Sequence, residues 1–155
     1  IADNIALINN GKLEDYGPPD RVYLRPNSLF AANFMGDSNI FEGNTIVDAN
    51  GQMSVKTQLG FFPLSCEVAP GAQVHISLRP EQLRLGSANK TDTIQLGSAK
   101  ITEVVFQGTH RLCHVLAGDH HAVNLLLRLP QEELVHPGDT INIHVRKEDV
   151  VLLSN

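Results

Sequence analysis

The chain has 155 residues, of which 42% are hydrophobic and 5% aromatic, and its 12 Lys and Arg against 17 Asp and Glu give a net charge of −5. This length suits one medium domain or two small ones, and it can bury enough surface to fold without a disulfide or a structural metal. The acidic balance argues against a nucleic-acid partner, because phosphate binding needs clustered Lys and Arg, and no apolar run approaches the roughly eighteen residues of a membrane span.

The first residue and the two cysteines indicate the setting of the chain. The sequence has no initiator Met, so we expect it to be a piece of a longer protein. Cys66 and Cys113 are expected to be buried thiols, which suits a reducing cytosol.

The helical signals of the sequence lie within its first 36 residues. An apolar run, an Asn-Gly turn and a second extended run predict a β-hairpin over Ile5–Tyr16. A helix of one or two turns is predicted within residues 18–26, since proline is tolerated in a first turn and excluded from a helix interior. Asn27 is expected to cap a second helix, with Gly36 at its C-terminal end.

From Ser38 onward, short β-prone runs alternate with turns rich in Gly, Pro, Asn and Asp. This pattern is typical of a β-barrel or a β-sandwich, so we predict a mainly β fold. The polar stretch Ser87–Thr93 is expected to be the longest loop. The predicted strands are Ile40–Val47, Met53–Gln58, Phe61–Cys66, Gln73–Leu78, Leu83–Leu85, Ile94–Phe106, Arg111–Leu116, Ala122–Leu129, Thr140–Val145 and Val150–Leu153.

An internal repeat relates residues 67–87 to residues 134–154 at a constant offset of 67. The first arm reads EVAPGAQVHISLRPEQLRLGS and the second reads LVHPGDTINIHVRKEDVVLLS, with eight identities in 21 positions. Each arm contains a Pro-Gly turn, a β-prone run, an Arg-x-Glu corner and a final short run. We interpret the arms as parts of two related β units; the alternative is that the ends of β-barrels generally look alike.

The Arg-x-Glu corners place Arg79 with Glu81 and Arg146 with Glu148. A structural ion pair or turn is the favoured interpretation, because the pattern recurs at the same point of both units, and a ligand-binding corner is the alternative. The sequence contains no GxxxxGK[ST] loop and no GxGxxG after a strand. Nucleotide binding by those motifs is therefore not predicted.

Seven histidines raise the question of a metal site. His110 and His114 lie on one predicted strand, where four residues span about 13 Å, too far for neighbours on one strand to share a zinc ion. His120 and His121 point to opposite faces if the chain is extended there. Cys113 is expected to be a packing residue rather than a nucleophile. We therefore predict no catalytic, cofactor-binding or metal-binding residue in this chain.

The stretch ADNIALINNGKLEDYGPPDRVYLRP over Ala2–Pro26 resembles the ATP-binding subunits of ABC-type importers. That family typically reads A-D-R-I-A-V-M-x-x-G-x-I-x-Q-x-G-T-P-x-E-I-Y-x-x-P in the stretch that follows its switch-histidine helix. Phe34–Asn39 and Ser77–Leu83 are similar to the family's F-I-G-x-x-N and [IV]-R-P-E-x-[IL], and the ending over residues 137–153 is also similar. The resemblance covers nearly the whole chain.

The resemblance implies two domains. Residues 1–36 would be the tail of the ATPase domain. Residues 37–155 would be a transport-associated OB-like (TOBE) domain, in which the repeat arms 67–87 and 134–154 belong to two OB-like halves. The expected fold is therefore an OB-like barrel or sandwich of two related β units, preceded by a short hairpin and one or two short helices.

Three positions depart from the family's usual pattern: Asn4 replaces Arg, Asp15 replaces Gln and Pro18 replaces Thr. None of them belongs to the ATP site, because the family's Walker A, signature, Walker B and switch-histidine motifs would all precede Ile1. The resemblance thus implies no cofactor in this fragment, and ATP with Mg²⁺ in the parent protein.

The function implied by the resemblance is a non-catalytic regulatory and dimerisation domain, in a parent that powers uptake of a small solute such as ferric iron, polyamine or phosphonate. The implied partners are a second copy of the subunit, membrane permease subunits reached through the parent's ATPase domain, and a small-molecule effector. The implied location is peripheral, at the cytoplasmic face of the bacterial inner membrane. Apolar faces at Val104–Phe106 or Leu125–Leu127 could supply an interface, although core packing explains them equally well. We expect the hairpin Ile5–Tyr16 to cover a barrel edge or to pair with a second chain.

The alternative function is a ligand-sensing OB-like module for a small oxyanion, metal or oligosaccharide. The turn Gln107–Thr109 and the cleft between the two units could offer backbone donors to an anion, although a plain hairpin turn is the favoured interpretation. Ser87–Asn89 matches only part of the Ser-Ala-Arg-Asn signature of molybdate-binding relatives. An independent enzyme activity has no group of residues to support it.

Overall fold

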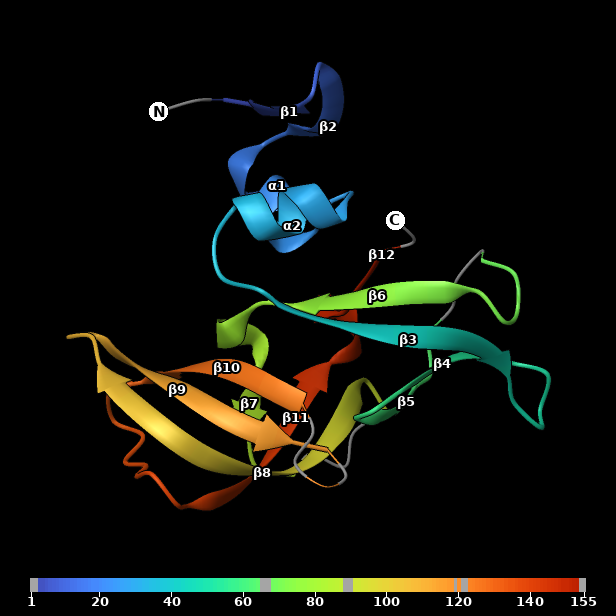
Figure 1. Cartoon of the computed structure of the whole chain (residues 1–155). Coiled ribbons are helices and arrows are strands. Elements are labelled where there is room, and N and C mark those ends of the chain that lie inside the picture. Colours follow the sequence, from blue (N-terminus) through green and yellow to red (C-terminus); the bar gives the residue numbers. More distant parts are fainter. Residues whose placement is uncertain (1–2, 65–67, 88–90, 119, 121–122, 154–155) are drawn as a thin grey trace.

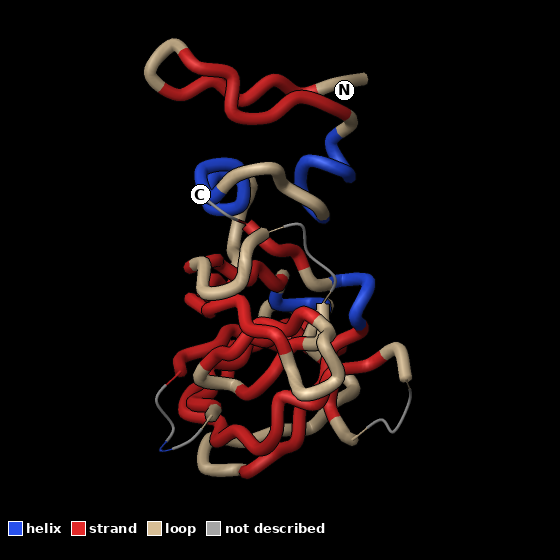
Figure 2. The backbone as a smooth tube through the Cα atoms, turned by 90° about the vertical axis from the view of Figure 1, so that its right-hand side faces the viewer, coloured by secondary structure: helices blue, strands red, loops and turns tan. Residues whose placement is uncertain are grey.

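The computed structural model describes residues 3–64, 68–87, 91–118, 120 and 123–153. A hairpin, a pair of helices and a β-barrel are stacked in this order along the molecule (Figures 1 and 2). The elements in chain order are β1 (Ile5–Asn9), β2 (Lys12–Gly17), α1 (Pro19–Leu24), α2 (Leu29–Phe34), β3 (Asn39–Val47), β4 (Met53–Thr57), β5 (Gly60–Phe62), β6 (Gln73–Leu78), the 3₁₀ turn η1 (Pro80–Gln82), β7 (Arg84–Leu85), β8 (Thr93–Phe106), β9 (His110–Ala117), β10 (Val123–Pro130), β11 (Thr140–Arg146), the 3₁₀ turn η3 (Lys147–Asp149) and β12 (Val151–Leu153).

The two predicted helices are present, but the cap of the second differs from the prediction. Ser28 is the N-cap of α2, and its Oγ accepts a hydrogen bond from the backbone N–H of Ala31 at 3.1 Å. Asn27 was predicted as the cap, and this prediction was wrong. The side chain of Asn27 instead donates to Asp15 at 3.1 Å, which leaves the next residue to satisfy the first turn of the helix.

The hairpin packs on the helices rather than on the barrel. Its strands β1 and β2 form a separate two-stranded sheet, and Leu7 is buried with Val22 of α1 and Ala31 of α2. The expectation that the hairpin covers a barrel edge was therefore wrong, because the helices already bury its apolar side (Figure 2). Pairing of the hairpin with a second chain stays a prediction.

Asp15 fixes the hairpin to the helices through one buried carboxylate. It accepts hydrogen bonds from Nη2 of Arg21 at 2.5 Å and from the backbone N–H groups of Asn27 at 2.9 Å and Tyr16 at 2.8 Å. Burial raises the pKa of Asp15, but the hydrogen bonds from these three donors outweigh it and leave the pKa below its ordinary value. This position, where the resembling family usually has Gln, is thus an ionic anchor here.

Replacing Asp15 by Asn is expected to lower the free energy of unfolding by about 1–2 kcal/mol at neutral pH, because Arg21 loses its charged acceptor. The folded-state pKa of Asp15 lies below its unfolded-state value. The stabilisation is therefore complete above the unfolded value and is lost as the pH falls through the folded value. Urea unfolding followed by circular dichroism at a series of pH values measures this. The variant and the unaltered chain should converge in acid, and a difference independent of pH would contradict the assignment.

The barrel consists of two five-stranded antiparallel sheets, with strand orders β12-β6-β3-β4-β5 and β10-β9-β8-β11-β7. We call β3 to β7 the first unit and β8 to β12 the second unit. Each sheet contains four strands of one unit and one strand of the other, because β12 pairs with β6 and β7 pairs with β11. The turns η1 and η3 lie at the repeat offset of 67. The predicted mainly β fold of two related units is confirmed.

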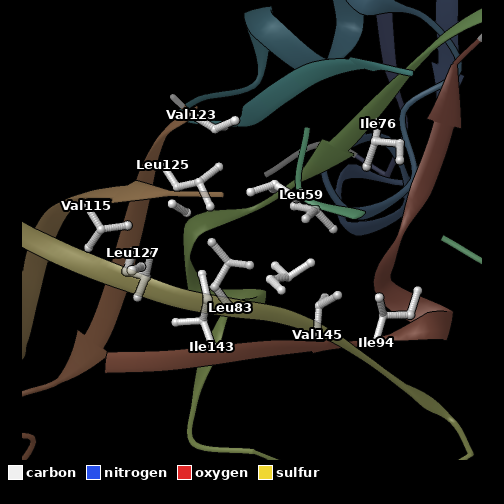
Figure 3. Close-up of a cluster of buried hydrophobic side chains, with 14 of the residues drawn as sticks. Leu59, Ile76, Leu83, Ile94, Val115, Val123, Leu125, Leu127, Ile143 and Val145 are labelled. Carbon is white, nitrogen blue, oxygen red and sulfur yellow. The ribbon is translucent and has the colours of Figure 1, made fainter. Parts of the chain in front are cut away.

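Apolar side chains from both sheets meet in a single core between them (Figure 3). Asn39 of β3 closes the barrel beside the edge strand β10. Its side-chain amide donates to the carbonyl oxygen of Leu126 at 2.9 Å and accepts from the N–H of the same residue at 2.7 Å, as a neighbouring strand would. The ten core residues labelled in the figure are Leu59, Ile76, Leu83, Ile94, Val115, Val123, Leu125, Leu127, Ile143 and Val145.

Most predicted strands agree with the structure to within a residue or two at each end, with one clear exception. The predicted strand Phe61–Cys66 ends at Phe62, because Pro63 has no N–H with which to continue the ladder. Cys66 lies outside the described residues. Residues 88–90 of the predicted loop Ser87–Thr93 also lie outside them.

Candidate functional site

The Arg-x-Glu position of the first unit, at η1, is where the barrel meets the helices. Arg79 is 2% exposed. Its Nε donates to the carbonyl oxygen of Tyr23 at 2.9 Å, and its Nη1 donates to the carbonyl oxygens of Ala32 at 3.0 Å, Gly36 at 3.2 Å and Asp37 at 3.0 Å. One barrel side chain thus ties the end of α1 and the end of α2 to the first unit.

The guanidinium of Arg79 is hydrogen bonded to backbone carbonyl groups rather than to a carboxylate. A helix leaves its last four carbonyls without partners and carries partial negative charge there, so a cation at the end of α2 is favourable. The guanidinium also lies 4.2 Å from the centre of the Tyr23 ring. Burial lowers the pKa of Arg79, which nearby Tyr23, Glu81 and Asp37 partly oppose. Within the part of the chain that the structure describes, Arg79 forms no ion pair with Glu81.

Glu81 faces the helices and β10 instead of Arg79. Its Oε2 accepts from the hydroxyl of Tyr23 at 2.6 Å, and its Oε1 lies 3.4 Å from Nη1 of Arg128. Arg128 also lies 3.6 Å from Asp37. Tyr23 and Arg128 were not identified from the sequence, because no local pattern links them to a corner that is more than 40 residues away from either of them in the chain.

The equivalent corner of the second unit is open. Arg146 keeps 41% of its side chain exposed and pairs locally, with its Nη1 3.2 Å from Oε1 of Glu148 and its Nε 3.0 Å from Oδ2 of Asp149. The hydrogen bond from Arg146 to Asp149 raises the pKa of Arg146. The predicted ion pair therefore forms within the second corner, while in the first corner the arginine is committed to the helices.

Each corner borders a hollow. A hollow of about 420 Å³ lies beside η1 and β7, and one of about 550 Å³ lies beside η3 and β12. We call them the first-corner hollow and the second-corner hollow. Arg25, from the loop after α1, reaches the second-corner hollow, where its Nη1 donates to the carbonyl oxygen of Glu148.

The two apolar faces considered as interfaces differ in exposure. Leu125 and Leu127 are 3% and 0% exposed, so core packing accounts for that face. Val105 and Phe106, near the end of β8, are 39% and 58% exposed, and the guanidinium of Arg111 lies 5.2 Å from the centre of the Phe106 ring. The Val104–Phe106 face is therefore the one available to a partner.

The turn Gln107–Thr109 joins β8 to β9 and is closed by its own groups. The Gln107 N–H donates to the carbonyl oxygen of His110 at 2.9 Å, and the side chains of Gln107 and His110 are hydrogen bonded at 2.7 Å. These are the contacts of a plain hairpin turn.

Cys113 and the histidines have side chains that can bind a metal or act as nucleophiles. Cys113 is buried in the core, where burial raises the pKa of its thiol. Among the described residues, no group of three or more His, Cys, Asp and Glu is placed to hold a metal ion. His121 lies outside those residues, and His120, which they include, is exposed. Neither α1 nor α2, nor any other helix in the described ranges, is long and apolar enough to cross a bilayer.

Comparison with protein-family models matches residues 76–153 to the TOBE domain. Over 90 residues the chain is 37% identical to the Fe(3+) ions import ATP-binding protein FbpC 1 of Haemophilus influenzae, covering 56% of this chain and 26% of that protein. It is 29% identical over 168 residues to the spermidine/putrescine import ATP-binding protein PotA of Trichodesmium erythraeum, covering 99% of this chain and 43% of that protein. The chain thus spans less than half the length of these relatives.

Among solved structures, the chain is similar to the cytoplasmic molybdate-binding protein ModG. The TM-score is 0.56 at 11% sequence identity, and the match covers 74% of this chain and 94% of ModG. At this identity the likeness concerns the fold, and it agrees with the two-unit barrel described above.

Proposed function

Because the chain belongs to the TOBE domain family, we propose that it is the non-catalytic regulatory and dimerisation domain of an ATP-binding subunit of an ABC-type importer. Residues 1–36 would be the end of the ATPase domain, and residues 37–155 the TOBE domain. ATP and Mg²⁺ would bind to the parent protein outside this fragment. The parent would lie at the cytoplasmic face of the bacterial inner membrane and contact permease subunits through its ATPase domain. Its solute would be small, such as ferric iron, a polyamine or a phosphonate.

The observation that carries this proposal is the joint at Arg79. Four backbone carbonyls of residues 23–37 accept from one buried side chain of the barrel, so the N-terminal segment and the barrel are held in a fixed orientation. A rigid joint is what a regulatory domain needs if its contacts are to influence the domain to which it is attached.

A contact between two copies of the barrel would keep two ATPase domains close together while they open and close. Linking the domains in this way raises their effective concentration without any new contact at the ATP site. The surface that we propose for this contact is Val104–Phe106, because Val105 and Phe106 are exposed at the end of a long β-hairpin while Val104 packs against the core. A two-fold contact would place the same face on both copies.

Replacing Phe106 by Ser is expected to weaken self-association of the chain about tenfold or more, because a central exposed aromatic ring contributes strongly to an interface of this kind. Multi-angle light scattering and sedimentation over a concentration series measure the effect. Phe61→Ser is the matched control, since Phe61 is 59% exposed against 58% for Phe106 but lies on β5. A monomeric unaltered chain at high concentration would contradict the dimerisation role, and ATP turnover by the purified chain would contradict the non-catalytic one.

A second candidate function is the sensing of a small ligand. The observation that favours it is the pair of hollows at the two corners, because the second-corner hollow touches both the barrel and the loop after α1. A ligand there would contact both parts that the Arg79 joint connects.

A further inference from the structure

The two corner hollows are related by the internal repeat. Glu81, Leu83 and Leu85 line the first-corner hollow, and their counterparts at the offset of 67, Glu148, Val150 and Leu152, line the second. The end of β10 completes one hollow, and the segment after β5 completes the other. Equivalent positions of the two repeat arms therefore line a hollow in each unit.

The two hollows differ in how their charged side chains are paired. In the first-corner hollow, Arg128 is neutralised by Glu81 at 3.4 Å and by Asp37 at 3.6 Å, and Glu133 also lines the wall. That hollow is balanced between cations and carboxylates. Among the described residues, Arg84 at the rim is the cation of this hollow that has no carboxylate partner.

In the second-corner hollow the cations are not neutralised. Arg25 and Lys147 line it, and within the described ranges neither forms an ion pair with a carboxylate. The one carboxylate of the lining, Glu148, is paired with Arg146 at 3.2 Å. Arg25 is held in place because its Nη1 donates to the carbonyl oxygen of Glu148. Two uncompensated cations thus share one hollow in a chain whose net charge is −5.

The rest of the second-corner hollow is lined by Asn27 and by prolines, valines and leucines, and polar atoms make up somewhat more of its exposed lining than apolar atoms do. Pro26 is buried, Leu64 and Leu152 are half-buried, and Pro63 is exposed at the rim. A volume of about 550 Å³ is within the usual range for small-molecule sites. Apolar side chains beside a few fixed charges suit an organic molecule that is bound by its charged end.

We propose that the second-corner hollow binds a small organic anion. The carboxylate or phosphoryl group would accept hydrogen bonds from Arg25 and Lys147, and the apolar body would pack on Leu64 and Leu152. Bound there, the anion bridges the loop after α1 to the last corner of the barrel. Only this regulatory consequence rests on the proposed function; the binding itself does not.

The test is an NMR titration of the ¹⁵N-labelled chain with phenyl phosphate, which combines a phosphoryl group with an apolar ring. Saturable shifts are expected for the amides of residues 25, 27, 64 and 147–152. Benzoate tests whether a carboxylate serves as well, and inorganic phosphate and phenol supply the charge and the ring separately. Both of these should bind at least tenfold more weakly than phenyl phosphate, because each keeps only half of the contacts.

Lys147→Gln is the decisive variant, because the Lys147 side chain makes no hydrogen bond or ion pair with another described residue, so we expect the variant to keep the fold. It should weaken phenyl phosphate about five- to tenfold, and Arg25→Gln by a similar factor. Arg84→Gln, in the first-corner hollow, should leave binding unchanged. Shifts centred on residues 81–85, unchanged affinity in Lys147→Gln, or equal affinity for inorganic phosphate would overturn the proposal.

The outcomes also separate this proposal from the proposed function. A chain that dimerises but shows no saturable shifts removes the anion site and leaves the dimerisation role. A chain that binds phenyl phosphate as a monomer keeps the site and removes that role. Saturable binding only of an acidic peptide, with none of phenyl phosphate or benzoate, would overturn the small-anion site in favour of a protein partner.

Discussion

Replacing Arg79 by Met should lower the free energy of unfolding by about 3 kcal/mol, the largest effect that we expect from a single side chain of the joint. Met keeps the length and most of the volume of the side chain but cannot donate a hydrogen bond. The carbonyl groups of residues 23, 32, 36 and 37 would then lose their shared donor in a largely buried place. Met also removes the cost of burying a charged guanidinium, which offsets part of the lost stability. The expected loss is therefore smaller than the sum of four charge-assisted hydrogen bonds.

The internal repeat supplies the control for this experiment. Arg146→Met changes the equivalent residue of the second corner, whose side chain is 41% exposed and forms its ion pairs with Glu148 and Asp149, so no resolvable loss is expected. Urea unfolding followed by circular dichroism compares the two variants. Amide hydrogen exchange should also rise across residues 5–36 in Arg79→Met more than in the barrel strands. An equal loss of stability in Arg79→Met and Arg146→Met would show that Arg79 does not hold the helices on the barrel.

Replacing Gly118 by Ala should cost about 3 kcal/mol, because two independent penalties meet at this residue. Its φ of +80° lies in the left-handed region, which is unfavourable for a residue with a Cβ atom. A Cβ atom there would also lie 2.8 Å from the carbonyl oxygen of Gln58 and 3.3 Å from Leu59 Cδ2. The backbone oxygen belongs to the turn between β4 and β5, so relief requires a turn of the other unit to move.

Gly71→Ala separates these two penalties. Gly71 has nearly the same φ, +82°, but a Cβ atom there would meet nothing within 4 Å. Gly71→Ala should therefore lower the free energy of unfolding only by the cost of the left-handed backbone conformation, about 1 kcal/mol. The additional loss in Gly118→Ala measures the contact between the two units. Thermal and urea unfolding of both variants give the difference. An equal loss of stability in the two variants would mean that the turns of the two units are not in tight contact.

The sequence was sufficient to predict the parts of the fold that local chemistry determines. The repeated Pro-Gly turns and Arg-x-Glu corners predicted two related units, and the structure places η1 and η3 at the same offset. The strand at Gln73–Leu78 was predicted to its end residues, because a turn and a proline bound it. The hairpin was also predicted in place, since an Asn-Gly turn between two apolar runs is a strong local signal.

The features that could not be predicted from the sequence depend on contacts between residues far apart in the chain. Arg79 and Arg146 occupy equivalent positions, yet one is buried and the other is open, because only the first is covered by α1 and α2. Asn27 and Ser28 are equally good N-caps by residue type. The hydrogen bond of the Asn27 side chain to Asp15, which lies 12 residues earlier, leaves Ser28 as the cap. Arg25 and Lys147 could not be placed in one hollow from the sequence, since the fold brings them together over more than 120 residues.

Because β6 receives its outer neighbour from β12, the first unit stays incomplete on the ribosome until Leu153 has left the exit tunnel. The paired residues Ser77 and Val151 are separated by 74 residues, which take roughly 4–15 s to synthesise at bacterial and eukaryotic elongation rates. Domains dominated by non-local strand pairs fold in milliseconds to seconds. Synthesis of the intervening segment thus takes at least as long as closure of the barrel, and during that time the nascent first unit has one edge of its sheet unpaired.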